Sequence, residues 1–322
     1  MKQIRDFIQS EDGVNRNEYI VWEPDDPGKA KGIVQICHGM AEHIGRYSHY
    51  AEYLAGRGFI VGGISHLGHG QTARTPDDLG FISSGDGASL LVADQYRMTG
   101  FLKERYPAKP LVLLGHSMGS FVARLYLSSH AEELSGAVIM GTAGPGAPAG
   151  FGLFVAGAVS LFRGERPRSR FINSLAFGSY NKRIGKDADR FAWLTRNEEY
   201  VKSYNADPLC GFTFTVSAFR DLFSMLGQIN CSEWAATVPT DLPLLLISGA
   251  EDPVGNYGKG VRKVAGMLAG AGARHLTVKL IPGDRHEVLN ETDKEISYSI
   301  IDKWLEEEVF SGAEETEGAD DQ

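Results

Sequence analysis

The chain has 322 residues, of which 43% are hydrophobic and 23% charged, a composition typical of a globular protein with a large core. Its formal net charge of -9 argues against a nucleic-acid partner, because an acidic surface repels a polyanion. This length allows two domains, or one large α/β domain with an insertion.

The cysteines and the chain ends favour a soluble, cytoplasmic protein. The 3 cysteines are an odd number without C-x-x-C spacing, so we expect reduced thiols and neither a disulfide framework nor a structural zinc site. Charged residues within 1–12 leave no apolar block for a signal peptide. The most apolar stretch, 151–162, is too short to span a bilayer. Residues 312–322 carry acidic groups and no large apolar side chain, and are predicted to be a disordered acidic tail.

Short runs of β-branched and apolar residues alternate with longer helical patterns along most of the chain. The runs predicted as buried strands are 32–38, 58–64, 111–114, 137–140, 244–247 and 276–281. Helical patterns lie between them, around 91–105, over 120–127 and over the apolar face that ends at Leu305. This alternation predicts an α/β fold with a mostly parallel, doubly wound sheet covered on both faces.

The alternation stops between the fourth and fifth predicted strands. A capping-box pattern from Thr195 to Glu198 predicts the start of a short helix. A later run of apolar residues, from Phe219 to Ile229, recurs at helical spacing. We therefore predict that residues 145–237 form a helical cap inserted into a core domain made of residues 1–144 and 238–311.

The segment Gly115-His-Ser117-Met-Gly119 matches the pattern G-x-S-x-G. It directly follows the predicted strand 111–114 and precedes the helical segment 120–127, which is the context of a strand–turn–helix elbow. Glycines suit such an elbow because the backbone at the serine is strained and the flanking chains pass closely. The N-terminus of the following helix favours developing negative charge. Ser117 is therefore the candidate nucleophile.

A serine nucleophile needs a general base and an acid that orients the base. In this elbow architecture they follow the serine in the order Asp or Glu, then His. Asp252 and His286 each come shortly after one of the last two predicted strands, so both lie at the sheet edge where Ser117 is expected. We predict Asp252 as the orienting acid and His286 as the general base. Glu251 and Asp284 compete for the acid role, or are solvated loop carboxylates.

Acyl transfer also needs hydrogen-bond donors for the oxyanion. The backbone N–H of Met118, the residue after the nucleophile, is the first predicted donor. The second is expected from the loop after the first predicted strand, where Gly39 lets the backbone turn toward the site. The N–H of Met40 is therefore the second predicted donor.

Several segments together resemble one branch of the α/β-hydrolases. The segments His38–Tyr47 and Gly115–Gly119 look like the monoacylglycerol lipase and lysophospholipase branch, which is often labelled serine aminopeptidase. The resemblance extends over residues 19–310 and includes Trp193–Val201 and Asn205–Phe212 of the predicted cap. It implies the α/β-hydrolase fold and the roles given above for the serine, aspartate, histidine and two amides.

The resemblance also implies an activity, namely hydrolysis of carboxylic esters of lipids such as monoacylglycerols or lysophospholipids, without a cofactor. An amidase or aminopeptidase on the same triad is the alternative, and it would need a carboxylate in the cap to bind a free amine. Glu198, Glu199 and Asp207 are candidates for that carboxylate. A ligand-binding receptor with a vestigial triad is an alternative from another class.

Three residues are candidates for substrate binding. The resemblance places Glu42 and Arg46 near the polar end of the pocket, unless they form an ion pair that stabilises their loop. Cys210 in the cap lines the pocket or is a packed thiol. The apolar segment 151–162 lines an acyl tunnel, dips into a lipid interface beside the arginines of 163–170, or is buried against the core. If the segment enters a lipid interface, a membrane surface is a further, transient partner of the cap.

One departure from the family pattern lies in the segment 65–70. The family commonly has an Asp and an Arg there, and the segment Ser65-His66-Leu67-Gly-His69-Gly70 replaces both, which affects specificity more than the reaction class. The segment also holds two histidines, His66 and His69. Without a carboxylate or cysteine at ligand spacing, these histidines predict no metal site. The glycines of 141–146 lack the register of a nucleotide-binding loop, so no cofactor is predicted.

Overall fold

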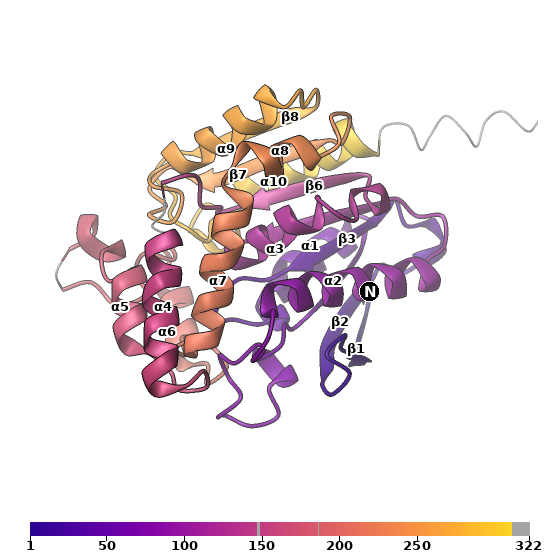
Figure 1. Ribbon diagram of the computed structural model, residues 1–322. Helices are drawn as coiled ribbons and strands as arrows, with labels where there is room; N and C mark the ends of the chain where they lie inside the picture. Colours follow the sequence, from indigo (N-terminus) through magenta and orange to yellow (C-terminus); the bar gives the residue numbers. More distant parts are fainter. Residues whose placement is uncertain (147–148, 186, 311–322) are drawn as a thin grey trace, which may run out of the picture.

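The computed structural model describes residues 1–146, 149–185 and 187–310. Its centre is one sheet of eight strands in the order β1-β2-β4-β3-β5-β6-β7-β8 (Figure 1). The strands are β1 (Lys2–Gln9), β2 (Arg16–Glu23), β3 (Ile33–Cys37), β4 (Ile60–Ile64), β5 (Leu111–His116), β6 (Gly136–Met140), β7 (Leu244–Gly249) and β8 (Leu276–Ile281). From β4 to β8 every neighbouring pair is parallel, which confirms the predicted fold class.

The first two strands were not predicted. β1 and β2 form an antiparallel hairpin, and β2 then pairs antiparallel with β4 at the edge of the parallel sheet. Exposed or half-buried residues make up all of β1, so its sequence lacks the continuous apolar run of a buried strand. The turn between the strands holds Gly13 at φ 72°, the second residue of an Asp-Gly pair of the kind typical of hairpins.

Helices cover both faces of the sheet, as the predicted double winding requires. On one face α1 (Ser48–Gly56) and α10 (Glu295–Trp304) pack against alternate strand residues such as Val34 and Ile36. On the other face α2 (Gly87–Arg105), α3 (Met118–Tyr126) and α9 (Lys259–Gly270) pack against the intervening residues, such as Ile33. Apolar side chains are therefore buried on both sides of each central strand.

The register places the carboxyl ends of the parallel strands together. Cys37 at the end of β3 pairs with Gly115 near the end of β5, and His116 pairs with Met140 at the end of β6. Gly249 at the end of β7 pairs with Ile281 at the end of β8. The loops that follow these strands consequently leave the sheet at one edge, where open α/β sheets bind ligands.

Among the described residues between β6 and β7 there are five α-helices, all inside the predicted cap 145–237. They are α4 (Ala149–Arg163), α5 (Arg170–Phe177), α6 (Glu198–Ala206), α7 (Val216–Ile229) and α8 (Ser232–Thr237). Figure 1 shows α4, α5 and α6 on the far side of α7 from the main body. α7 packs against α4 and also against α2 and α3, while α8 contacts α9. The apolar spacing that predicted a helix over 219–229 belongs to the buried side of α7.

The capping box predicted from Thr195 is wrong. α6 begins at Glu198, and its N-cap is Asn197, whose side chain accepts a hydrogen bond from the Glu199 amide at 3.2 Å. The Thr195 side chain instead donates to the Asn290 carbonyl at 3.0 Å, because this threonine is buried against the segment after β8. A contact distant in sequence thus displaces the local capping pattern.

Short helical turns complete the backbone. They are η1 (Pro27–Lys29), η2 (Ile44–Tyr47), η3 (Gly70–Thr72), η4 (Ala131–Glu133), η5 (Tyr180–Arg183), η6 (Val288–Asn290) and a π-helical turn, η7 (Leu305–Val309). In the part of the chain that the structure describes, no helix combines the length and apolarity needed to cross a membrane. The predicted acidic tail, 312–322, lies outside the described residues.

Candidate active site

Ser117 lies in a sharp turn between β5 and α3, which confirms the predicted strand–turn–helix elbow. Its backbone has φ 54° and ψ -120°, a left-handed conformation that is strained for a residue with a side chain. Both flanking positions are glycine because neighbouring backbone comes too close to leave room for a side chain. A Cβ on Gly119 would lie 2.0 Å from the Cys37 carbonyl oxygen, and one on Gly115 would lie 2.4 Å from the Gly119 carbonyl oxygen.

His286 and Asp252 meet although they come from different loops. The Nδ1 atom of His286 is 3.0 Å from an Asp252 carboxylate oxygen, and both side chains are buried. The carboxylate also accepts hydrogen bonds from the Ser248 hydroxyl at 3.0 Å and the Val254 amide at 2.8 Å. Burial by itself would raise the pKa of Asp252, but His286 and these donors lower the pKa below its ordinary value. Asp252 is therefore an anion at neutral pH.

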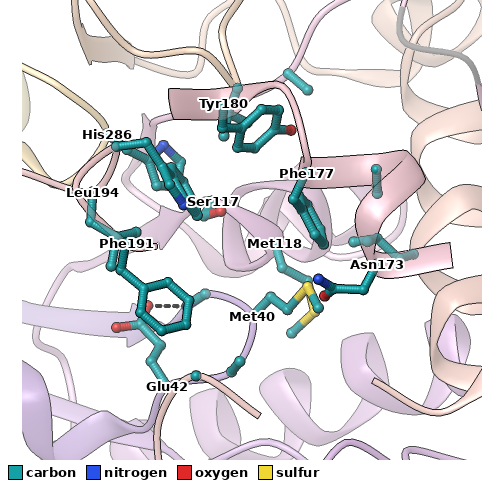
Figure 2. A pocket seen from close by; sticks show the side chains of 18 of the residues that line it. Met40, Glu42, Ser117, Met118, Asn173, Phe177, Tyr180, Phe191, Leu194 and His286 are labelled. Carbon is teal, nitrogen blue, oxygen red and sulfur yellow. Dashed lines mark hydrogen bonds between the residues drawn. The ribbon is translucent and has the colours of Figure 1, made fainter. Parts of the chain in front are cut away.

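The other ring nitrogen of His286 is left available beside the cavity that Ser117 also lines. Nε2 is buried and has no hydrogen-bond partner among the described residues. Ser117 and His286 line the same cavity (Figure 2). Because Nδ1 lies against an anionic carboxylate, it carries the proton in the neutral ring, which leaves Nε2 as an acceptor.

The two rival acids lie in other surroundings. Glu251 is exposed, with its carboxylate 3.7 Å from the Arg183 guanidinium. Asp284 is fully buried, so the alternative that it is a solvated loop carboxylate is wrong. Its carboxylate accepts a hydrogen bond from Arg196 at 2.6 Å, and burial together with Glu291 raises its pKa to about 7. Neither carboxylate makes a hydrogen bond to His286 within the described chain.

The loop after β3 passes directly over the elbow. A Cβ on Gly39 would lie 3.1 Å from the Ser117 Cβ, so only glycine allows the backbone to come this close. Met40 and Met118 both line the cavity. The Met118 amide is the first of α3 and so lacks an intrahelical acceptor. In the described chain the Met40 amide has no hydrogen-bond partner either.

Glu42 joins this loop to a buried network of charged and polar groups. Its carboxylate accepts from the Tyr47 hydroxyl at 2.9 Å and from Arg46 at 2.5 Å, and it lies 3.2 Å from His116 Nδ1. Arg46 also forms a bidentate pair with Glu287, with two contacts of 2.8 Å. Although burial opposes ionisation, Arg46 and His116 lower the pKa of Glu42 well below its ordinary value.

The three predicted substrate-binding residues take different places. Glu42 lines the cavity, whereas Arg46 and Cys210 are not among the described residues that line it. Arg46 lies behind the wall, between Glu42 and Glu287, as the ion-pair alternative anticipates. Cys210 lies beside Asp207 and His43, and burial raises its pKa well above the ordinary value.

The cavity over Ser117 has a volume of about 370 Å³, within the usual range for a small-molecule site. Much of its wall is apolar, with side chains from four cap helices or turns, α5, η5, α6 and α7, and from the core; they include Phe121, Phe177, Leu222, Phe223, Leu226 and Val254. Figure 2 shows Phe177 and Tyr180 of the cap facing Met118 and His286 of the core. No described lining residue comes from 151–162, so that segment does not form the wall of this cavity.

Two cap residues next to His286 carried no role in the sequence analysis. The Trp193 ring centre is 5.1 Å from that of His286, and the Leu194 carbonyl accepts a 2.7 Å hydrogen bond from the Glu287 amide. Nothing in their local pattern marks them, because their importance comes from a loop distant in sequence. The only signal was that Trp193–Val201 belongs to the segments that resemble the family.

The predicted non-ligands His66 and His69 are buried beside His38. Burial lowers the pKa of His66 to about 3 and that of His69 to about 4, so both rings are neutral. Within the described residues, two groups of ligand-type side chains lie close enough to share an ion: His43, Asp207 and Cys210; and Asp284, Glu291 and Asp293. Arg196 forms ion pairs with all three carboxyl groups of the second group, and His43 pairs with Asp207 in the first.

Comparison with known proteins decides the family. The model of the family described as serine aminopeptidase, S33 matches residues 28–293. The chain belongs to this family. It is 28% identical over 295 residues to the monoacylglycerol lipase of Mycolicibacterium smegmatis, covering 89% of this chain and 91% of that protein. Identity to the monoglyceride lipase of Homo sapiens is 26% over 291 residues, covering 88% and 84%.

Solved structures support the same fold. A thermostable carboxyl esterase from Bacillus coagulans, solved with glycerol, has a TM-score of 0.86 and 29% identity, covering 95% of this chain and 99% of that chain. A soluble variant of the Saccharomyces cerevisiae monoglyceride lipase has a TM-score of 0.75 over 96% of both chains, and at 19% identity it shows the fold alone. The resemblance to monoacylglycerol lipases and the α/β-hydrolase fold are thereby confirmed.

Proposed function

We propose that this protein is a serine hydrolase that cleaves carboxylic esters of lipids, such as monoacylglycerols or lysophospholipids. One observation carries the proposal. A serine on a strained elbow shares an apolar cavity with the free nitrogen of a histidine whose other nitrogen lies 3.0 Å from a buried carboxylate. Such an arrangement supports a Ser-His-Asp triad as the catalytic unit. Lipases and esterases among the similar proteins support the same reaction class.

The proposed mechanism uses only groups of this chain. Ser117 Oγ attacks the ester carbonyl carbon while His286 Nε2 takes the hydroxyl proton, and Asp252 stabilises the resulting imidazolium. The carbonyl oxygen becomes an oxyanion that accepts hydrogen bonds from the Met40 and Met118 amides. The bond to the leaving alcohol then breaks, and His286 donates its proton to that alcohol. Water repeats the sequence on the acyl-enzyme and releases the fatty acid.

The carboxylates around the cavity favour this reading over an aminopeptidase. A free amine needs an available carboxylate in the site, but Glu42 and Glu287, which line the cavity, already bind Arg46. The candidates named from the sequence are also poorly placed. Glu198 and Glu199 are exposed on α6 and are not among the described lining residues, and Asp207 pairs with His43 at 3.0 Å.

A substrate panel tests the proposal. We expect hydrolysis of medium-chain acyl esters and of monoacylglycerol, with aminoacyl anilides cleaved far more slowly. Faster cleavage of the anilides would promote the peptidase alternative. Labelling with a fluorophosphonate separates an active hydrolase from a receptor with a vestigial triad, because only an activated serine forms the adduct. Absence of labelling at Ser117 would contradict the proposal.

We also propose that the cap meets a lipid surface through α4 and α5. Large apolar side chains on these helices project into solvent: Phe151, Phe154, Leu161, Phe162, Phe171 and Leu175. Exposed arginines, Arg163 and Arg170, adjoin them. Aromatic side chains beside basic ones are the composition of surfaces that enter the interface of a bilayer. The opposite side of α5 lines the cavity through Asn173 and Phe177, so a bound lipid surface would lie close to the cavity.

A further inference from the structure

Ala41, the residue after Met40, is tied to the cap by two hydrogen bonds. Its carbonyl oxygen accepts from the Tyr204 hydroxyl at 2.8 Å and from the Gly211 amide at 2.9 Å. Ala41 is buried and has φ 54°, a left-handed conformation that is unfavourable for alanine. Because the loop does not favour this shape by itself, the bonds from the cap help to keep it there.

The other end of the same loop is tied to the core. The Gly39 amide donates to the Glu42 carboxylate at 2.6 Å. Between the two ties lies the amide of Met40, which has no acceptor in the described chain and is the proposed oxyanion donor. The direction of this amide therefore depends on one anchor in the core and one in the cap.

The cap anchor is closely packed. Tyr204 is buried, its ring centre lies 4.8 Å from that of Phe191, and the Arg46 guanidinium lies 4.7 Å above the ring. Gly211 has φ 66°, and a Cβ there would lie 2.9 Å from the Phe191 ring. A second tie joins the same two segments, because His43 Nε2 is 3.0 Å from the Asp207 carboxylate.

We infer that the cap assembles the oxyanion hole, with Tyr204 as a positioning residue that holds the Met40 amide toward the reacting carbonyl through Ala41. This inference rests on the proposed function and adds a second task to the cap, which also encloses the substrate. Figure 2 shows Phe191 and Met40 on the same side of the cavity as Glu42. Tyr204 lines the cavity, and its hydroxyl, which is hydrogen-bonded to the Ala41 carbonyl, acts on the Met40 amide through Ala41.

The substitution Tyr204→Phe tests the inference because it removes only the hydroxyl. Removing an oxyanion donor costs about 10²–10³-fold in kcat. Here the donor is displaced and the Gly211 bond remains, so we expect kcat for a medium-chain ester to fall about tenfold. KM should change less than about twofold, since the apolar wall is intact. The matched control is Tyr200→Phe, four residues earlier on α6. In the described chain the Tyr200 hydroxyl makes no hydrogen bond to this loop, so its loss should leave kcat unchanged.

A pair of ligands separates positioning from general damage to the cap. A trifluoromethyl ketone forms a tetrahedral adduct with the serine and needs the oxyanion hole, whereas an ether analogue of monoacylglycerol has no carbonyl. We expect Tyr204→Phe to lower the affinity for the ketone by the same factor as it lowers kcat/KM, and to leave the affinity for the ether unchanged. An equal loss of affinity for both ligands would overturn the inference, because it would indicate a disturbed pocket.

The outcomes for the inference and for the proposed function are distinct. A wild-type protein that hydrolyses esters, with Tyr204→Phe and Tyr200→Phe equally active, overturns the inference and leaves the proposed function in place. A wild-type protein that hydrolyses no ester and binds no ketone overturns the proposed function, and the inference with it. Thermal unfolding of each variant within a few degrees of the wild type verifies that the comparison concerns folded proteins.

Discussion

At the scale of single residues, Ser117 combines backbone strain with a central chemical role in the proposed mechanism. The substitution Ser117→Ala removes only the hydroxyl group, so the backbone of the elbow and the shape of the cavity should be retained. We expect ester turnover to fall about 10³-fold or more while the protein stays folded, because nucleophile and base act as a unit. Ser129→Ala, at an exposed serine just after α3, is the control. Turnover of Ser117→Ala near the control value would remove the assignment.

Asp252 and its neighbour Glu251 offer a second test within one dipeptide. Asp252→Asn replaces an acceptor beside His286 Nδ1 by an amide, which favours the wrong tautomer, so we expect a loss of up to about 10⁴-fold in kcat. Glu251→Gln alters an exposed carboxylate 3.7 Å from Arg183 and should lower kcat by less than about twofold. Steady-state kinetics of both variants decide the matter. The reverse ranking would move the acid role to Glu251.

At the scale of elements, the buried carboxyl group of Asp221 on α7 should make the stability of the folded protein depend on pH. Burial raises the pKa of this carboxyl to about 7, against an ordinary value of 3.8, and Oδ2 has no hydrogen-bond partner among the described residues. Arg220 lowers this pKa, while Asp86 and Glu165 raise it. Since the folded state binds the proton more tightly, the contribution of Asp221 to stability is greatest at low pH. It is lost as pH rises through about 7.

We therefore expect Asp221→Asn, which keeps the shape without the charge, to raise the Tm at pH 8 by about 2–4 °C. At pH 5 the gain should be smaller, because the wild-type carboxyl is then already protonated in the folded state. Thermal unfolding at both pH values measures the difference, with the exposed carboxylate of Asp241 changed to asparagine as control. Equal gains at the two pH values would show that Asp221 does not titrate in this range.

The apolar surface of α4 and α5 leads to a test with vesicles. Phe162 is 90% exposed, so Phe162→Ser should leave the fold unchanged. Burying a phenylalanine side chain stabilises by about 1.5–3 kcal/mol, so we expect partitioning onto phosphatidylcholine vesicles containing phosphatidylglycerol to fall about tenfold. Phe7→Ser, at an exposed phenylalanine on β1, is the matched control. Co-sedimentation that is equal for both variants would contradict contact through the cap.

At the scale of the whole molecule, the cavity lies between the core and the cap, and its apolar wall sets the expected substrate. Each methylene of an acyl chain that leaves water contributes about 0.8 kcal/mol. We expect kcat/KM for simple esters to rise from acetyl to at least octanoyl, several-fold for each pair of carbons, until the wall ends. A series of esters with one leaving group measures this rise. A preference for acetyl esters would contradict the lipid reading.

Much of this architecture could be predicted from local patterns. The strands β3 to β7 are buried apolar runs bounded by turn residues, and burial on both faces makes such runs visible without any partner. β8 was also predicted as a buried strand, but it lies at the edge of the sheet and is mostly half-buried. The elbow at Ser117 was also readable, because the close approach of Gly119 to Cys37 leaves room only for glycine. β1 escaped prediction because its exposed residues carry no such run, although the Asp12-Gly13 pair marked its turn.

The sequence by itself determined the order of strands and helices, the elbow, and the spacing that suggests Ser117, Asp252 and His286, since these depend on local chemistry. Only the tertiary structure decided which groups meet. It placed Asp252 and not Asp284 against His286, and it buried Asp284 beneath Arg196. Such contacts join loops far apart in the chain, and their geometry follows from how the sheet and the cap pack together. No local pattern contains that information.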